Sequence, residues 1–267
     1  MLEILSYSFI QNALLAGIIV SIITAIIGTL VVVNKMVFLS GGIAHSAYGG
    51  IGLTMYFGLP MLLSTSLFCV AVTILIAFAS YKNRENLDIM IGLTWSVGMS
   101  FGIILADLTP GYQTDLMSYL FGSLLAVSIE DVYYMASLML IIFIIIAIFY
   151  RDILAVSYDS EYANLRGIKT KFFYTLILVL SSLAIVISIK VVGLILVIAL
   201  LTIPIYISSF FSSNLLSMMV LSAFLSIVFT IIGLAISYQF DISSGPAIIM
   251  SGSVCALIIF ILKSIKK

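Results

Sequence analysis

Long apolar runs, each followed by a short cluster of charged, glycine, proline or serine residues, dominate this chain of 267 residues. Hydrophobic residues make up 63% of the chain and charged residues 8%, whereas a soluble globular chain is about 25% charged. A membrane span needs about 20 apolar residues, so the apolar content is enough for eight or nine spans. The sequence therefore predicts an all-α polytopic membrane protein, organised as a single transmembrane domain over residues 1–267.

The apolar runs predict nine transmembrane helices if each run crosses the membrane. Glu3 stands where a signal peptide would have a basic region, so we interpret the first run as an uncleaved span. Glycines weaken the second run, and eight spans result if two broken runs form one discontinuous element. The stretch from Asp115 to Ser128 is apolar but too short to cross, which favours an interfacial or re-entrant helix. The expected spans are 9–33, 37–58, 60–81, 88–106, 130–150, 172–189, 191–211, 215–238 and 245–262.

The basic residues predict the orientation, because Lys and Arg are enriched in cytoplasmic loops. If Lys35 is cytoplasmic, alternating spans place ten of the eleven basic residues on that side and only Lys190 outside. The N-terminus is then external and the C-terminus cytoplasmic. The acidic residues expected on the external side are Asp107, Asp115, Glu130, Asp131 and Asp241.

Several classes of function are disfavoured by what the sequence contains and lacks. Eleven acidic residues balance eleven basic ones, which removes any general argument for nucleic-acid binding. No Gly-Lys-Ser/Thr motif occurs, so the chain has no phosphate-binding loop of its own. One histidine cannot form a two-histidine protease motif, and Cys69 and Cys255 lie far apart in apolar runs, where packing is the usual role. Catalysis is therefore the weaker interpretation, and transport the stronger one.

His45 is the only histidine and lies in the second apolar run, ten residues beyond Lys35. A helix rises about 1.5 Å per residue, which places His45 about 15 Å into the membrane. Ionisable groups at that depth are costly and usually face a polar path or a partner. Imidazole suits zinc, iron, copper and nickel as a ligand, and it also serves in mixed oxygen and nitrogen sites for manganese. The alternative role is a hydrogen bond across a glycine-rich helix interface.

The polar segment 151–171 predicts a short cytoplasmic helix. Asp159 or Ser160 can cap the start of this helix, and Glu161 would lie favourably at the positive end of the helix dipole. Gly167 can end the helix. Tyr158, Tyr162 and Leu165 recur at helical spacing and share one apolar face. Such a helix can dock in a groove of another protein, or it can lie on lipid headgroups as an ordinary loop helix.

Weaker signals lie elsewhere in the chain. The external carboxylates Asp115 and Asp241 can form an acidic mouth that attracts cations, although isolated loop acids are more often simply solvated. Pro204 can interrupt a helix and expose backbone groups where a pathway runs. Gly98 and Gly102, four residues apart, are a weak signal for a helix contact.

Several segments, taken in order along the chain, match one family pattern. They are Phe9-Ile-Gln-Asn-Ala-Leu14, the stretch from Phe38 to Ala47, Asp115 to Gly122 with Leu125 to Ser128, Tyr158 to Ile168, Val192 to Pro204, and Asp241 to Pro246. Each motif alone is modest, but the ordered set covers most of the chain. Together they resemble the permease subunits of the ABC-3 family, the membrane components of zinc, manganese and iron ABC importers.

The resemblance implies the fold of type II ABC importers and a homodimer of permeases. It also implies two separate ATPase subunits that bind ATP, and an external protein that delivers the metal. The cargo it implies is a divalent transition-metal ion, zinc or manganese, moving past His45. The coupling segment it implies consists of Tyr158, Asp159, Ser160, Glu161, Tyr162, Ala163 and Gly167. The family path uses an Asp and a His in the second span, and here Gly41 occupies the Asp position.

Two alternatives stay open at this point. A gradient-driven secondary transporter needs no ATPase, but such proteins usually carry carboxylates within the membrane, and none lies clearly within a span here. The same machinery can also move another cargo, such as a metal chelate, because Gly41 departs from the family pattern.

Overall fold

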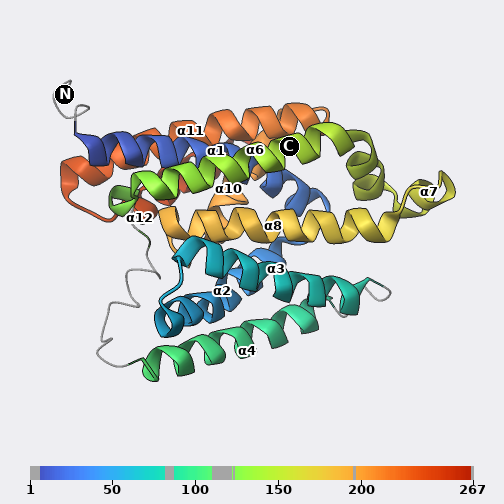
Figure 1. Cartoon of the computed structure of the whole chain (residues 1–267). Coiled ribbons are helices and arrows are strands. Elements are labelled where there is room, and N and C mark those ends of the chain that lie inside the picture. Colours follow the sequence, from blue (N-terminus) through green and yellow to red (C-terminus); the bar gives the residue numbers. More distant parts are fainter. Residues whose placement is uncertain (1–6, 82–86, 110–121, 123, 195–196, 266–267) are drawn as a thin grey trace. The chain divides into compact units, whose positions relative to one another are not determined.

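The computed structural model describes residues 7–81, 87–109, 122, 124–194 and 197–265, and within these ranges every regular element is a helix (Figure 1). Contacts group the chain into two compact units. Unit 1 comprises Met1–Val32, Met117–Met139 and Ser188–Lys267, and unit 2 comprises Val33–Leu116 and Leu140–Ile187.

Unit 1 is held together by small side chains and hydroxyl groups. Its helices are mainly α1 (Ser8–Val33), η3 (Leu124–Ala126), α9 (Val197–Leu200), α10 (Ile203–Ser209), α11 (Leu215–Phe240) and α12 (Ser244–Ile265). The Ser21 and Thr230 hydroxyls hydrogen-bond at 2.9 Å between α1 and α11, and those of Ser208 and Ser222 at 2.7 Å between α10 and α11. Polar groups in a hydrocarbon core need protein partners because water is absent there, so these bonds suit helices that pack within a membrane.

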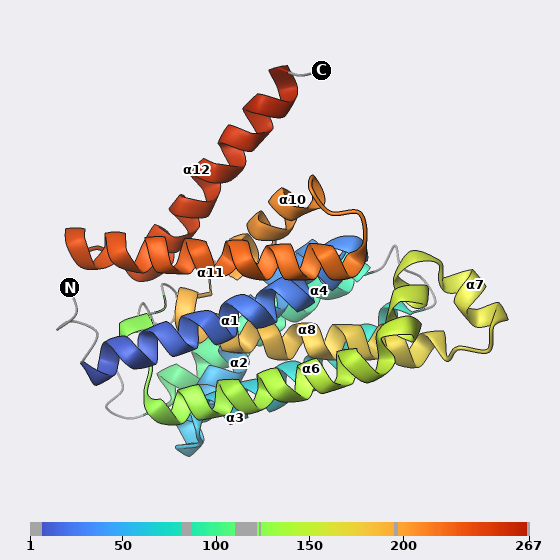
Figure 2. The same ribbon diagram turned by 90° about the horizontal axis from the view of Figure 1, so that it is seen from above.

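The α11–α12 pair packs closely from its connecting turn to the middle of α12, where the Ser251 hydroxyl donates to the Phe229 carbonyl at 3.2 Å. A Cβ on Gly233 of α11 would lie within 2.6 Å of Ile248 atoms, so the two helices touch there. Farther along, α12 diverges from α11 (Figure 2). Its second half exposes large apolar side chains, namely Leu257, Ile258, Phe260, Ile261 and Leu262. Such a surface is compatible with lipid contact.

Unit 2 combines a three-helix group with a long hairpin. Its helices are α2 (Val37–Phe57), α3 (Met61–Ser80), α4 (Leu87–Asp107), most of α6 (Ile129–Tyr158), α7 (Ser160–Leu165) and most of α8 (Thr170–Val192). The Ser80 hydroxyl hydrogen-bonds that of Tyr174 at 2.9 Å, and the Tyr81 hydroxyl bonds that of Thr170 at 2.8 Å. These two bonds fix the end of α3 against the start of α8.

Glycines bring α2 and α4 into direct backbone contact. The closest pairs, in order along both helices, are Gly42 with Ile91, Ser46 with Gly98, and Tyr48 with Gly102. Because the numbers rise together, the two helices run parallel, and Figure 1 shows them side by side. We call Gly42, Gly98 and Gly102 the glycine seam. It explains the weak signal of Gly98 and Gly102, since small residues let helix backbones approach closely.

We expect Gly102→Ala to lower the stability of the protein. A Cβ there would collide with the backbone carbonyl of Tyr48, which cannot move aside as a flexible side chain can. Overpacking of this kind costs about 1–3 kcal/mol. The matched control is Gly92→Ala on the same helix, where a Cβ meets nothing within 4 Å and the midpoint should not fall. Thermal unfolding of both variants in detergent checks this, and equal losses would contradict the seam.

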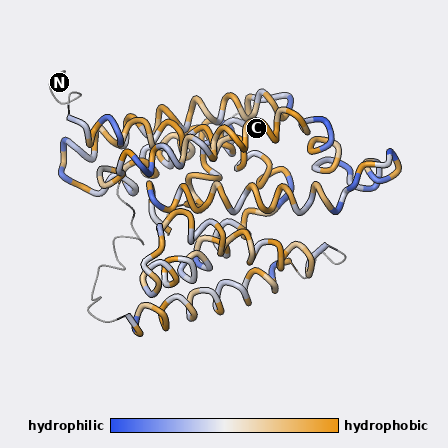
Figure 3. Tube along the Cα trace, viewed as in Figure 1, coloured by the Kyte–Doolittle hydropathy of each residue, from blue (hydrophilic) through white to orange (hydrophobic). Residues whose placement is uncertain are grey.

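Seven of the predicted spans are confirmed as helices that are long and apolar enough to cross a membrane. They are α1, α3, α4, α6, α8, α11 and α12. Figure 3 shows the same pattern, with apolar residues along the helix shafts and hydrophilic ones gathered around α7 and at helix ends. The expected count of eight or nine is therefore too high for the described residues by this measure.

The two remaining predicted spans do not meet the criterion of a helix long and apolar enough to cross a membrane, for different reasons. α2 is an unbroken helix of 21 residues, but its glycines, serines and His45 dilute its apolar character. The run 191–211 is not one helix. It gives the four-residue α9 and the seven-residue α10, with Pro204 in the first turn of α10. Proline lacks the N–H that would continue a preceding helix, so it favours a new start at this place.

Candidate functional site

His45 stacks on Trp95. α2 carries the histidine and α4 carries the tryptophan, the only one in the chain. The ring centroids are 4.1 Å apart and the planes differ by 6°, so the rings lie face to face. The His45 Nδ1 atom is buried and has no hydrogen-bond partner within the described part of the chain. The hydrogen bond across a helix interface that sequence offered as the alternative role is therefore not made by this atom.

Among the described residues of α2, His45 provides the side-chain nitrogen that could bind a metal ion. Gly41 lies buried one helical turn earlier on the same helix, and it brings no carboxylate. No group of three or more His, Cys, Asp and Glu side chains that could hold a metal occurs among the described residues. A single nitrogen donor suits brief binding rather than storage, and a transported ion has to be released.

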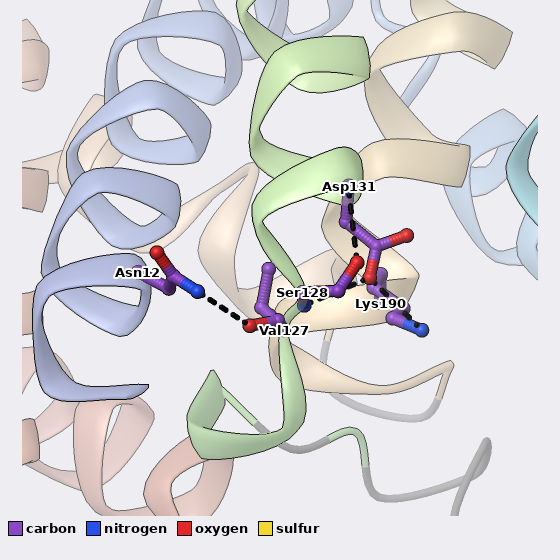
Figure 4. Close-up of polar contacts among 5 residues, drawn as sticks. All are labelled: Asn12, Val127, Ser128, Asp131 and Lys190. Carbon is purple, nitrogen blue, oxygen red and sulfur yellow. Dashed lines mark hydrogen bonds and ion pairs between the residues drawn. The ribbon is translucent and has the colours of Figure 1, made fainter. Parts of the chain in front are cut away.

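Asp131, in the first turn of α6, belongs to a local polar cluster (Figure 4). Asp131 and Ser128 cap the helix reciprocally, each side chain accepting from the other's N–H at 3.1 Å. Lys190, near the end of α8, lies 3.4 Å from the Asp131 carboxylate, and both side chains are largely buried. The Asn12 side chain donates to the Val127 carbonyl at 3.5 Å. Sequence alone gave no partner for Lys190, the one basic residue predicted outside.

The predicted acidic mouth is described only in part. Asp241 is an exposed residue that ends α11 in the left-handed conformation, with φ of 53°, and its N–H donates to the Ser237 carbonyl. Asp115 lies outside the described residues, as does most of the predicted interfacial helix, of which η3 is the described part. The mouth therefore stays a prediction.

The predicted coupling segment contains a short capped helix. α6 bends at Phe149, with φ of −102° and ψ of 16°, and then continues to Tyr158, eight residues past the end of the expected span. The Asp159 carboxylate accepts hydrogen bonds from the N–H groups of Glu161 and Tyr162 at 3.1 and 2.9 Å. This is N-capping of α7, the helix start that its sequence predicts.

Gly167 closes α7. Its φ of 78° is a left-handed conformation that glycine adopts without strain. The Gly167 N–H donates to the Asn164 carbonyl at 2.9 Å, and the Ile168 N–H donates to the Ala163 carbonyl at 3.1 Å. Ala163 is fully buried. The Asp159 carboxylate thus fixes the start of α7 and backbone hydrogen bonds fix its end, so the side chains of Tyr162 and Leu165 have no capping role.

Three exposed side chains are together called the α7 patch: Tyr158, the last residue of α6, and Tyr162 and Leu165 of α7. Asp159 is extended and separates the two helices, so Tyr158 does not share the single helical face predicted for all three. The exposed fractions of the three patch side chains are 64%, 49% and 87%. The Arg166 guanidinium lies 5.2 Å from the centre of the Tyr162 ring, which places a cation beside the patch. Leucine and two tyrosines exposed on the most polar segment of the chain are typical of a contact surface.

The sequence alone does not indicate that Trp95 is part of the site. Its uniqueness was visible, and the nearby Gly98 and Gly102 indicated a helix contact. Neither signal indicates which helix packs against α4 or the register between the two helices. The contact of Trp95 with His45 depends on both.

Comparisons with known proteins agree in family and fold. The profile of the ABC 3 transport family matches residues 6–263. An uncharacterized membrane protein of Synechocystis is 40% identical over 97% of this chain and 92% of its own length. The manganese transport system membrane protein MntC of Listeria monocytogenes is 30% identical over the same shares. A chain of the solved structure of PsaBC from Streptococcus pneumoniae in complex with Fab matches with a TM-score of 0.85 and 29% identity, over 95% of this chain and 91% of that one.

Proposed function

The chain belongs to the ABC 3 transport family, and from that premise we propose that it is the permease subunit of an importer that moves a divalent transition-metal ion past His45 into the cytoplasm. The whole chain acts as one permease domain. ATP hydrolysis takes place on a separate subunit, since the chain has no phosphate-binding loop. Membership of this family favours the ATP-driven importer over the alternative function of a gradient-driven secondary transporter.

The observation that carries the proposal is the unpartnered Nδ1 of His45. Leaving a buried polar atom without a hydrogen bond costs about 1–3 kcal/mol, and such atoms usually have a functional explanation. A neutral imidazole nitrogen is a good ligand for transition metals. A metal ion that passes along α2 would satisfy this atom for part of each transport cycle.

The cargo is zinc or manganese, and the donor set favours zinc. The named relatives include a manganese transport protein, and carboxylate oxygens are the ligands that suit manganese. Here Gly41 leaves the imidazole of His45 without a carboxylate one turn away. Imidazole nitrogen binds zinc more strongly than manganese, in accordance with the general affinity order of divalent metals.

We expect Zn²⁺ to stimulate ATP hydrolysis and uptake more than Mn²⁺ in proteoliposomes that contain the permease and its ATPase. Gly41→Asp should then raise Mn²⁺ uptake relative to Zn²⁺ several-fold, because it places a carboxylate one helical turn from His45. Uptake of each ion at matched free concentration measures the ratio.

The matched control for this change is Gly41→Asn, which has nearly the same size without the charge. It should leave the ratio of Mn²⁺ to Zn²⁺ uptake close to that of the unmodified protein. An equal shift in both variants would mean that packing of α2, rather than the carboxylate, sets the preference. If neither ion stimulates ATP hydrolysis, the proposed cargo is wrong.

The partners follow the same proposal. Two copies of this permease assemble with two ATPase subunits, and the α7 patch receives the ATPase on the cytoplasmic side. An external metal-binding protein docks at the opposite face of the membrane, where the start of α6 and the acidic residues Asp115 and Asp241 are predicted to lie. The N-terminus is external and the C-terminus cytoplasmic, as the distribution of basic residues supports.

A further inference from the structure

We propose that Trp95 is a positioning residue for His45, and that the stacked pair binds the passing metal ion as one unit. This inference rests on the proposed path past His45. It assigns a role to a residue of α4 that donates no ligand atom. The indole fixes the plane of the imidazole and stabilises it when the metal is bound.

The first support is the geometry of the stack. With ring centroids at 4.1 Å and planes 6° apart, the indole lies stacked against one face of the imidazole. Rotation of the imidazole about its side-chain bonds would break this contact. Phe38, two helical turns before His45 on α2, lies 6.3 Å from the Trp95 ring and contacts it as well. The indole is therefore held by two aromatic side chains of the same helix.

The second support is the fixed register of the two backbones. Ser46, next to His45, donates to the Gly42 carbonyl at 2.7 Å and to the Thr94 carbonyl, next to Trp95, at 3.0 Å. One turn farther on, a Cβ on Gly98 would lie 2.8 Å from Ser46 Cα. Both rings thus project from backbone segments that touch each other, so the stack is preorganised before the metal arrives.

The third support is the electrostatics of the two rings. An indole carries a negative potential on its face, and a cation or an electron-poor ring above it is attracted. A metal bound at Nδ1 draws electron density from the imidazole, so the stack becomes stronger when the ion is bound. A residue that only fills space would show no such dependence on the metal. This difference separates a positioning role from plain packing.

Uptake kinetics of Trp95 variants test the proposal in the assembled complex. We expect Trp95→Leu to raise the KM for Zn²⁺ uptake about fivefold with little change in kcat, because the imidazole loses its supporting ring. Trp95→Phe keeps a ring in place and should restore most of the affinity. If Trp95→Leu has a KM within twofold of the unmodified protein, the positioning role is refuted.

The fluorescence of the unmodified permease gives a second readout that needs no change at Trp95. Because Trp95 is the only tryptophan, emission of the full purified chain in detergent reports on this ring when excitation is at a wavelength that the tyrosines do not absorb. Zn²⁺ has no unpaired electrons, so a saturable change in emission reports a change in the stack. His45→Ala should abolish that change. No response in the unmodified chain, or an equal response in His45→Ala, overturns the inference.

The two proposals fail in different ways. Loss of uptake in His45→Ala together with unchanged kinetics in Trp95→Leu removes the role of Trp95 and leaves the proposed path intact. Normal uptake in His45→Ala removes the path itself, whatever the Trp95 variants do.

Discussion

His45→Ala should reduce metal uptake by at least about tenfold, since even the loss of a residue that only orients a metal ligand costs about 10–100-fold. The replacement removes the one nitrogen donor that the described part of the second span offers. Alanine brings no ligand atom of its own into the space beside Trp95. ATP hydrolysis without metal should be unaffected, because hydrolysis is proposed to take place on a separate subunit that docks at α7, a helix that the replacement leaves unchanged. Uptake of ⁶⁵Zn into proteoliposomes, with ATP hydrolysis followed in parallel, measures both effects.

Two variants separate the loss of a ligand from the loss of helix packing. His45→Gln keeps a side chain of similar length that stacks poorly and coordinates weakly, and it should lose uptake nearly as fully as alanine. Thr54→Ala changes another partly buried residue of α2, whose hydroxyl donates to the Gly50 carbonyl of its own helix, and it should transport normally. Unchanged uptake in His45→Ala would show that the metal takes another route.

Sequence predicts this fold well where a helix is apolar along its whole length. α1, α3, α8 and α11 follow directly from their apolar runs, and their ends lie close to the expected ones. The prediction of one span over 191–211 is wrong because the apolar content of a segment indicates how well it suits a membrane but not whether it forms one continuous helix. Pro204 was recognised as a helix breaker, but whether it kinks one helix or separates two depends on tertiary packing.

The parts of the site differ in how far sequence can define them. The caps of α7 involve residues within nine positions of one another, from Asp159 to Ile168, so local rules suffice. The contact of His45 with Trp95 joins residues fifty positions apart. It exists because the glycine seam sets the register of α2 against α4, and a single sequence does not determine which two helices share a seam. The pair of Asp131 and Lys190 was missed for the same reason.

Replacing Glu161 and Tyr162 together by alanine should abolish co-purification of the ATPase with the permease. Tyr162 is half exposed in the α7 patch, and exposed aromatic residues at interface centres often contribute about 2 kcal/mol or more each, which is about thirtyfold in affinity. α7 itself should persist in the variant, because Asp159 caps the backbone N–H groups of both residues rather than their side chains. Pull-down of the ATPase through a tag on the permease measures the interaction.

The chain offers a matched control at the other end of α6. Glu130 and Tyr133 are an exposed acid and an exposed tyrosine in the first turns of this helix, on the side predicted to be external. The double alanine variant there removes the same chemical groups, and it should leave ATPase binding intact. If both double variants retain the ATPase, α7 is a loop helix on the lipid headgroups, the alternative that its amphipathic pattern allows. If both lose it, the loss reflects a general destabilisation of α6 and α7. Only selective loss at α7 supports the coupling role, because only that result depends on which face of the membrane the changed side chains occupy.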